Sequence, residues 1–299
     1  MRFVTVKKAD EVFVGVMDEE LQRVLHMQKA QVEMGQEMTI PGEMLLCIEQ
    51  GETFFTKVNA VVKWAKENKT KAYYSVKEVE LLAPIPRPTK NIFCVGKNYR
   101  EHAVEMGGEE AIPEDMIMFT KSPTTVIGHG AHIDSYTELT NELDYEGELA
   151  IVIGKRGKGI KAADAMEYVF GYTIVNDVTA RDLQRKHKQF FIGKSFDTFC
   201  PMGPAIVHKS AIENPNQLHI ETKVSGEVRQ SSNTEHMMFP IEKIIEIVSK
   251  GMTLEPGDVI ATGTPAGVGK GFKPPRFLKK GDTVEITVER VGTLRNEVK

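Results

Sequence analysis

The chain has 299 residues, of which 41% are hydrophobic and 27% are charged, and its formal net charge is -4 at pH 7. This balance is typical of a globular protein with one or two domains, and it argues against a nucleic-acid partner bound through bulk positive charge. No apolar run is long enough for a membrane span, no signal-peptide pattern is present, and the three cysteines form no CxxC pair, so we expect a cytoplasmic protein with no membrane partner.

The first eighty residues predict a small α+β domain. Residues 3–6 and 12–16 are short runs rich in Val and Phe, which favour strands. Two stretches with helical character follow, around 21–34 and 57–68. Strands and helices of this length can form one small layer-on-layer unit.

Three prolines within residues 83–89 indicate a linker, because proline ends regular structure and stiffens the chain. We therefore expect an N-terminal domain at 1–82, the Pro-rich linker, and a larger domain at 90–299. The larger domain is dominated by short strands, with its best helix at 241–248. The expected fold class is mixed, β-rich α+β.

A short helix after residue 98 could carry a general base. Asn98 is a plausible N-cap, with Glu101 three residues later. His102 and Glu105 are then three apart on one helix face, and a carboxylate-oriented histidine is a suitable base near neutral pH. An ordinary surface pair is the alternative. Residues 107–110 (GGEE) indicate a mobile lid.

Three carboxylates form the strongest candidate site. Glu146 and Glu148 alternate along a strand-like segment, so they share a face and lie roughly 6–7 Å apart along the chain. Asp177 ends a second strand-like segment. If the two strands are neighbours, like-charge repulsion among the three groups calls for protons or a cation. Oxygen ligands of this kind suit Mg²⁺ or Mn²⁺; two exposed acids on an edge strand are the alternative.

Polar residues after Asp177 could contact a carboxylate substrate. Arg181 and Gln184 are three apart and could share a helix face, although Arg181 could equally pair with nearby carboxylates. Lys194 lies in an apolar stretch, where a lysine is costly to bury without a partner. It could bind a substrate carboxylate or stabilise an enolate, or it could extend its amine to solvent.

A glycine-rich segment at 262–271 fails the spacing of a phosphate-binding loop. Its backbone donors could instead hold a carboxylate or enolate oxygen. Gly263 and Thr264 are therefore predicted substrate-binding residues, together with Arg181 and Lys121.

Five motifs, in this order and spacing, together resemble the fumarylacetoacetate hydrolase family over roughly residues 88–299, and the whole chain resembles its bacterial YisK-like branch. The motifs are residues 96–102 (GKNYREH), 144–149 (DYEGEL), 176–184 (NDVTARDLQ), 193–197 (GKSFD) and 262–269 (TGTPAGVG). The resemblance implies a mixed β-roll catalytic domain, usually in a homodimer, with the metal in the mouth of the roll.

The resemblance also implies roles for individual residues. The family's Mg²⁺ or Mn²⁺ ligands correspond to Glu146, Glu148 and Asp177. The dyad on the lid that activates water corresponds to His102 and Glu105. Residues that orient the oxo and carboxylate groups of the substrate correspond to Gln184 and Lys194, and Thr264 corresponds to a contact in the glycine-rich loop.

The function implied is metal-dependent cleavage of a C–C bond in a small 2-oxo acid or diacid through a stabilised enolate. Oxaloacetate decarboxylation and acylpyruvate hydrolysis, for example of fumarylpyruvate, are the leading reactions. An isomerase or decarboxylase of 2-hydroxy-diene-dioates is the alternative within the family. A metal-bound interaction protein with a non-catalytic role is the alternative of another class.

Overall fold

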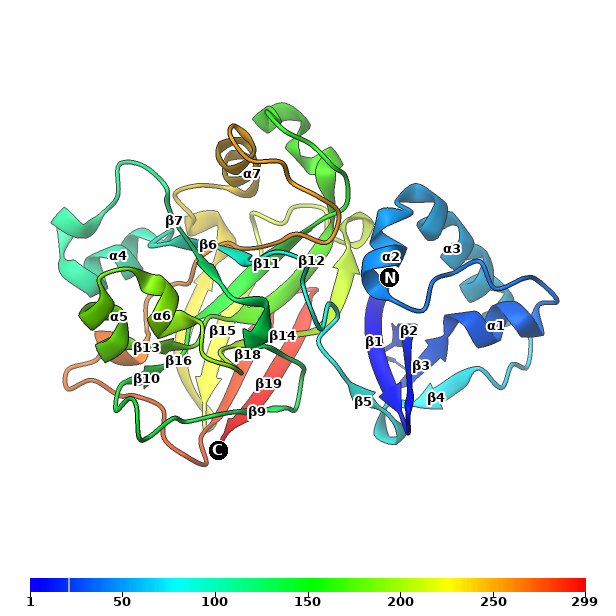
Figure 1. Cartoon of the computed structure of the whole chain (residues 1–299), viewed down its shortest axis with the longest axis horizontal. Helices are drawn as coiled ribbons and strands as arrows, with labels where there is room; N and C mark the ends of the chain where they lie inside the picture. Colours follow the sequence, from blue (N-terminus) through cyan, green and yellow to red (C-terminus); the bar gives the residue numbers. More distant parts are fainter. Residues whose placement is uncertain (21) are drawn as a thin grey trace.

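One twelve-stranded sheet extends through both halves of the chain in this computed structural model, which describes residues 1–20 and 22–299 (Figure 1). Its main path is β4 (Tyr73–Ser75), β3 (Arg23–His26), β2 (Glu11–Asp18), β1 (Arg2–Lys8), β14 (Cys200–His208), β12 (Val169–Asn176), β11 (Gly147–Ile153), β17 (Val259–Ala261), β6 (Ile92–Gly96) and β7 (Ile117–Lys121). Two short strands join it at the side, β5 (Glu80–Leu81) on β1 and β8 (Val126–Ile127) on β14.

A second sheet packs against the larger half. Its five strands are β16 (Glu227–Asn233), β15 (His219–Val224), β18 (Thr283–Val288), β19 (Gly292–Val298) and β9 (His132–Ile133). A two-stranded pair, β10 (Leu143–Asp144) with β13 (Thr179–Ala180), lies beside the site described below. The expected mixed, β-rich α+β class is confirmed.

The α-helices of the described ranges are short, apart from α3, which has 16 residues. They are α1 (Met27–Glu33), α2 (Met44–Glu49), α3 (Glu52–Glu67), α4 (Arg100–Gly107), α5 (Arg181–His187), α6 (Phe190–Lys194) and α7 (Ile241–Ser249). Single-turn or two-turn 3₁₀ helices occur at Val76–Glu78, Glu109–Ala111, Pro123–Thr125, Ala162–Tyr168, Lys209–Ala211, Thr234–His236 and Gly269–Gly271. None of the helices in the described ranges is long and apolar enough to span a membrane.

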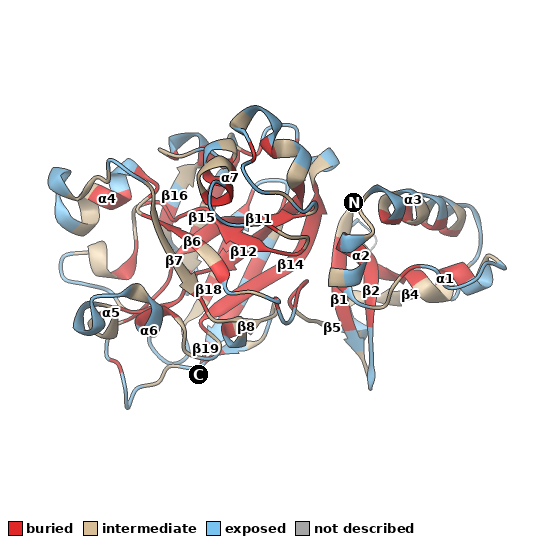
Figure 2. Cartoon of the chain, turned by 45° about the horizontal axis from the view of Figure 1, so that its top comes forward, coloured by how far each residue is buried: buried red, intermediate tan, exposed pale blue. Residues whose placement is uncertain are grey.

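Strand β11 is buried on both faces, as Figure 2 shows by its continuous red colour. Leu149 and Ile151 pack in one cluster with Ile286 of the five-stranded sheet. The opposite face of β11 joins another cluster, which includes Phe3 and Phe54 from the first eighty residues. This double burial holds β11, which carries Glu148, rigidly in place.

The predicted helix around 21–34 is wrong in its first part. Residue 21 lies outside the described residues, and Arg23–His26 form strand β3, which pairs with β2 and β4. Val24 and Leu25 are fully buried there. Pairing with two neighbouring strands therefore overrides the local helical pattern, whereas α3 confirms the helix expected around 57–68.

The first eighty residues contact the larger half through backbone and side chains. Strand β1 pairs with β14 at Phe3 and Ile206. Thr5 donates a hydrogen bond to the carbonyl of Pro84 at 2.6 Å, and Pro84 itself is buried. The domain division at 83–89 stays a prediction.

His208, at the end of β14, makes this junction sensitive to acid. Its ring stacks on Phe55 with centroids 3.9 Å apart, and burial, with the N-terminal amine and Lys209, lowers its pKa from 6.5 to about 4. A histidine with a depressed folded-state pKa binds protons better when unfolded. Its contribution to stability is therefore complete above pH 6.5 and is lost as the pH falls toward 4.

We expect the free energy of unfolding of His208→Phe to fall less than that of the unchanged protein between pH 6.5 and 4, because the variant keeps an aromatic ring and cannot take up the proton. Urea unfolding at several pH values measures this difference. The exposed His219→Gln serves as control. Parallel pH curves for His208→Phe and the unchanged protein would rule out the role of His208.

Candidate metal centre

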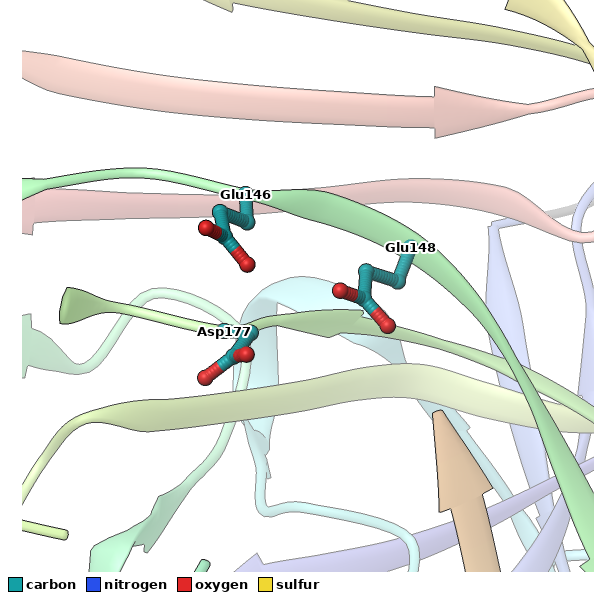
Figure 3. Close-up of side chains that lie close together, drawn as sticks. All are labelled: Glu146, Glu148 and Asp177. Carbon is teal, nitrogen blue, oxygen red and sulfur yellow. The ribbon is translucent and has the colours of Figure 1, made fainter. Parts of the chain in front are cut away.

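The three predicted carboxylates converge on one point (Figure 3). Glu148 lies on β11 and pairs with Val175 of β12, and Asp177 follows β12 directly. One ligand oxygen from each of Glu146, Glu148 and Asp177 lies within 4.8 Å of the other two. All three residues are at most 5% exposed, which excludes the alternative of exposed acids on an edge. Glu146 lies just before β11 rather than within it.

The charges of this cluster are only partly compensated. Burial raises the pKa of Glu148 well above its usual range, and Asp177 and Glu146 raise it further. For Glu146, burial acts in the same direction, but Lys194 and Arg181 outweigh it and lower its pKa. A carboxylate at position 148 is therefore short of positive charge, and a hard divalent cation would supply it. The donor set thus fits a metal ion with oxygen ligands.

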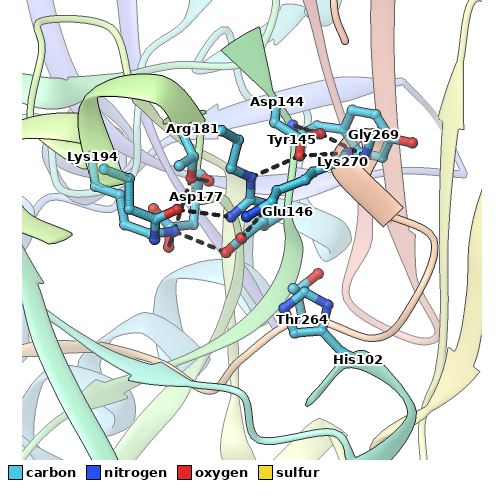
Figure 4. A network of polar contacts seen from close by, with 12 residues as sticks. His102, Asp144, Tyr145, Glu146, Asp177, Arg181, Lys194, Thr264, Gly269 and Lys270 are labelled. Carbon is cyan, nitrogen blue, oxygen red and sulfur yellow. Dashed lines mark hydrogen bonds and ion pairs between the residues drawn. The ribbon is translucent and has the colours of Figure 1, made fainter. Parts of the chain in front are cut away.

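Lys194 contacts two of the three carboxylates from helix α6 (Figure 4). Its Nζ lies 2.6 Å from Asp177 Oδ2 and 3.0 Å from Glu146 Oε2, and it donates to Thr179 Oγ1 at 2.8 Å. Burial lowers the pKa of Lys194, but Asp177 and Glu146 outweigh burial and raise it. The side chain is 2% exposed, so the alternative of an amine extended to solvent is wrong.

Lys121 lies behind the cluster instead of facing a substrate. Its Nζ, fully buried, contacts Asp177 Oδ1 at 2.6 Å and the carbonyl of Val178 at 3.0 Å. It is absent from the lining of the adjacent cavity. In this structure Lys121 therefore holds Asp177, and its predicted contact with substrate stays a prediction. Lys121 reaches Asp177 from the end of strand β7.

Arg181 begins α5 and joins the cluster to Asp144. Its Nε lies 2.8 Å from Asp144 Oδ2, and its Nη2 lies 2.7 Å from Glu146 Oε1. Its Nη1 also lies 3.4 Å from Gln184 Oε1, as expected for two residues on one helix face. The ion-pair alternative is therefore correct for Arg181, which also lines the cavity together with Gln184.

The predicted dyad forms on helix α4. His102 Nδ1 lies 3.3 Å from Glu105 Oε2, and His102 is 4% exposed and lines the cavity. An exposed surface pair is therefore excluded. The second oxygen of Glu105 accepts a hydrogen bond from the backbone N–H of Gly267 at 2.9 Å, which ties α4 to the glycine-rich loop.

The N-cap expected at Asn98 is wrong. The cap position is Tyr99, without a side-chain hydrogen bond. The amide of Asn98 instead donates to the carbonyls of Thr262 and Phe239 and accepts from the backbone of Phe239. Partners more than 140 residues away thus replace the local cap.

The glycine-rich loop acts on the carboxylates through its backbone. The N–H of Gly263 donates to Glu148 Oε2 at 2.7 Å, so it holds a ligand of the metal site, and Gly263 does not line the cavity. Its predicted contact with substrate stays a prediction. Thr264 does line the cavity, and its hydroxyl donates to the carbonyl of Gly147 at 2.9 Å.

A cavity of about 330 Å³, a size that suits a small organic acid, is lined by His102, Glu146, Glu148, Arg181, Gln184, Lys194 and Thr264. The lining includes four cations that the sequence predictions did not include: Lys97, Arg185, Lys188 and Lys270. In the sequence, these four cations lie in or close to the five motifs, and that clustering could have identified them. From the sequence, no role was predicted for Asp144 either. In the structure its carboxylate accepts hydrogen bonds from the backbone of Gly269, the backbone of Lys270 and Nε of Arg181.

Comparison with known proteins agrees with this geometry. Residues 91–299 match the family model for the fumarylacetoacetate (FAA) hydrolase C-terminal domain. The chain is 54% identical over 302 residues to oxaloacetate tautomerase YisK of Bacillus subtilis, with all of both chains covered.

Two solved structures are also similar. The fumarylacetoacetate hydrolase of Exiguobacterium antarcticum has a TM-score of 0.81 and 39% identity, covering 100% of this chain and 99% of that one. The maleylpyruvate hydrolase of Sphingobium sp. SYK-6, in complex with manganese(II) and pyruvate, has a TM-score of 0.77 and 27% identity, covering 100% and 98%. The chain is therefore an enzyme that belongs to the fumarylacetoacetate hydrolase family.

Proposed function

We propose that this enzyme interconverts the keto and enol forms of oxaloacetate with a divalent cation. The observation that carries the proposal is that two members of the three-carboxylate cluster, Glu146 and Glu148, line one small cavity together with Lys194 and with His102 of the dyad. An acid–base group beside a metal site is what enolisation next to a carbonyl requires. Whole-length identity of 54% to an oxaloacetate tautomerase supports the choice of substrate.

Mg²⁺ or Mn²⁺ is the cation that we propose, held by Glu146, Glu148 and Asp177. The oxygen donors favour both ions, and a related hydrolase binds manganese(II) together with pyruvate. When bound, the ion would act as a Lewis acid toward the oxo and carboxylate oxygens of the substrate.

The dyad is the proposed base. With Nδ1–H of His102 donated to Glu105, Nε2 is free to accept a proton. Removal of a proton from C3 by His102 leaves an enolate. Water then protonates the C2 oxygen, and the hydroxide that forms takes the proton from His102, which restores the base and completes the tautomerisation. Lys194 would stabilise the charge on that oxygen, while Gln184 and Arg181 would orient the adjacent carboxylate.

Cleavage of a C–C bond is the second candidate. The dyad supports acylpyruvate hydrolysis, since it could activate water, and a structural relative is a maleylpyruvate hydrolase. Oxaloacetate decarboxylation would need no attacking water, because loss of CO₂ leaves the enolate of pyruvate, which the same site would stabilise. Isomerisation of diene-dioates stays the family alternative, and a non-catalytic interaction role is the alternative of another class. The homodimer and the cytoplasmic location stay predictions.

Enolisation is tested by following the enol absorbance of oxaloacetate with metal-loaded protein. We expect turnover above the metal-catalysed background, and a loss of about 10–150-fold in Lys194→Met, the usual cost of a lost hydrogen bond to a charged group. Lys273→Met, exposed and outside the cavity lining, is the matched control. Tautomerisation at the background rate, alongside production of pyruvate, would favour decarboxylation instead.

A further inference from the structure

The cavity carries more positive charge than its own carboxylates can balance. Arg181 and Lys194 pair with the carboxylate cluster, and Arg185 pairs with Glu142 at 2.6 and 2.7 Å. Three further cations line the cavity: Lys97, Lys188 and Lys270. Within residues 1–20 and 22–299, no carboxylate lies within ion-pair distance of these three amines.

Lys270 is the best placed of the three. Lys188 is exposed at the end of α5, and the amine of Lys97 lies 3.4 Å from the carbonyl of Ala111. Lys270 is half-buried, and its backbone N–H donates to Asp144 Oδ2 at 3.1 Å. The main chain at Lys270 is therefore anchored while its amine lacks a carboxylate partner.

The surroundings of Lys270 favour an anion. Burial lowers the pKa of its amine, and the charges of Arg181 and Arg185 lower it further. A bound anion beside Lys270 would relieve this repulsion and the cost of burial together.

A line of contacts connects Lys270 with the metal site (Figure 4). Asp144 Oδ2 accepts from both the backbone of Lys270 and Nε of Arg181, and Arg181 Nη2 reaches Glu146. Lys270 is thus joined to the carboxylate cluster through Asp144 and Arg181, and it lines the same cavity as Arg181 and Glu146. A small acid held at the cluster by one end would extend its other end along this line.

We propose that Lys270 is a specificity-determining residue that binds the second carboxylate of a dicarboxylic 2-oxo acid, at the end of the substrate remote from the metal site. This proposal rests on the proposed function, in which oxaloacetate is the substrate. It gives a role to a cation that lines the cavity without a carboxylate partner among the described residues. A 2-oxo acid with one carboxylate would leave Lys270 without a partner.

The test compares oxaloacetate with its 4-methyl ester, which keeps the 2-oxo acid head and lacks the second charge. In Lys270→Met we expect KM for oxaloacetate to rise about 10–150-fold, the cost of losing one hydrogen bond to a charged group, with kcat little changed. KM for the ester should stay within about twofold. Lys270→Arg should recover most of the affinity, and Lys273→Met, which removes a charge outside the cavity, should match the unchanged protein.

Equal losses for both substrates would overturn the proposal, because Lys270 would then act only on the loop. Calorimetric titration of Mn²⁺-loaded protein with both compounds separates this outcome from failure of the proposed function. Tighter binding of oxaloacetate than of its ester, lost in Lys270→Met, without turnover would contradict the proposed function and keep the role of Lys270. Equal affinity of the unchanged protein for both compounds would overturn the role of Lys270, whatever the rate of turnover.

Discussion

Glu148→Gln should lose catalysis and gain stability at the same time. The substitution removes one ligand of the proposed cation, and the Lewis-acid contribution of a metal ion is several kcal/mol, so we expect turnover to fall by about 10³-fold. Chelation with EDTA should lower the turnover of the unchanged protein to a similar extent. Added Mg²⁺ or Mn²⁺ should restore turnover in the chelated unchanged protein and should not restore it in Glu148→Gln.

The gain in stability has an electrostatic cause. Burial, Asp177 and Glu146 all raise the pKa of Glu148, so its ionised form is costly in the metal-free protein at neutral pH. Glutamine has the same shape without that charge. Metal-free Glu148→Gln should therefore have a higher Tm than the metal-free unchanged protein.

Thermal unfolding with and without Mn²⁺ measures both effects. Saturating Mn²⁺ should raise the Tm of the unchanged protein by mass action and leave that of Glu148→Gln nearly constant. The exposed Glu213→Gln is the matched control, with normal activity and a normal Mn²⁺ response. Full activity of the chelated protein would contradict the metal site, whatever the change in Tm.

His102→Ala should separate reactions that need a base from one that does not. Proton removal from C3 of oxaloacetate and attack of water on an acylpyruvate both require it, so we expect each rate to fall by about 10²–10⁴-fold. Decarboxylation of oxaloacetate needs no such base, because loss of CO₂ itself leaves the enolate. Its rate should fall by less, through poorer closure of α4 over the cavity.

The experiment measures enol absorbance, acylpyruvate cleavage and pyruvate production on one preparation of known metal content. Glu101→Ala, exposed on the same helix, is the control for a general effect on α4. An equal fall in all three activities would show that His102 has no special role as a base. Retained binding of oxaloacetate by calorimetry then distinguishes a defect in catalysis from a distorted cavity.

Local patterns in the sequence were sufficient for part of the site. Alternation along an extended segment places Glu146 and Glu148 on one face, and three-residue spacing on a helix brings His102 to Glu105. Both inferences depend only on the period of a strand or a helix. The convergence of Asp177 depended on its strand being the neighbour of β11, a condition that the pairing of Glu148 with Val175 fulfils.

Contacts between distant segments were decided by the tertiary structure alone. Asn98 bonds to Phe239 and Thr262 instead of capping α4, and Lys121 lies behind Asp177. No spacing in the sequence reports which side of a carboxylate a distant lysine will face.

Contacts between distant segments also decided the structure of β3 and the position of Lys270. Residues 23–26 have a helical pattern, yet the edges of β2 and β4 take them into a sheet. Lys270 acquires its place in the cavity from Asp144, more than 120 residues earlier in the chain. Period and composition describe a segment and its immediate neighbours. The order of strands in a sheet determines which segments meet, and the contacts of Lys121, Gly263 and Lys270 depend on that order.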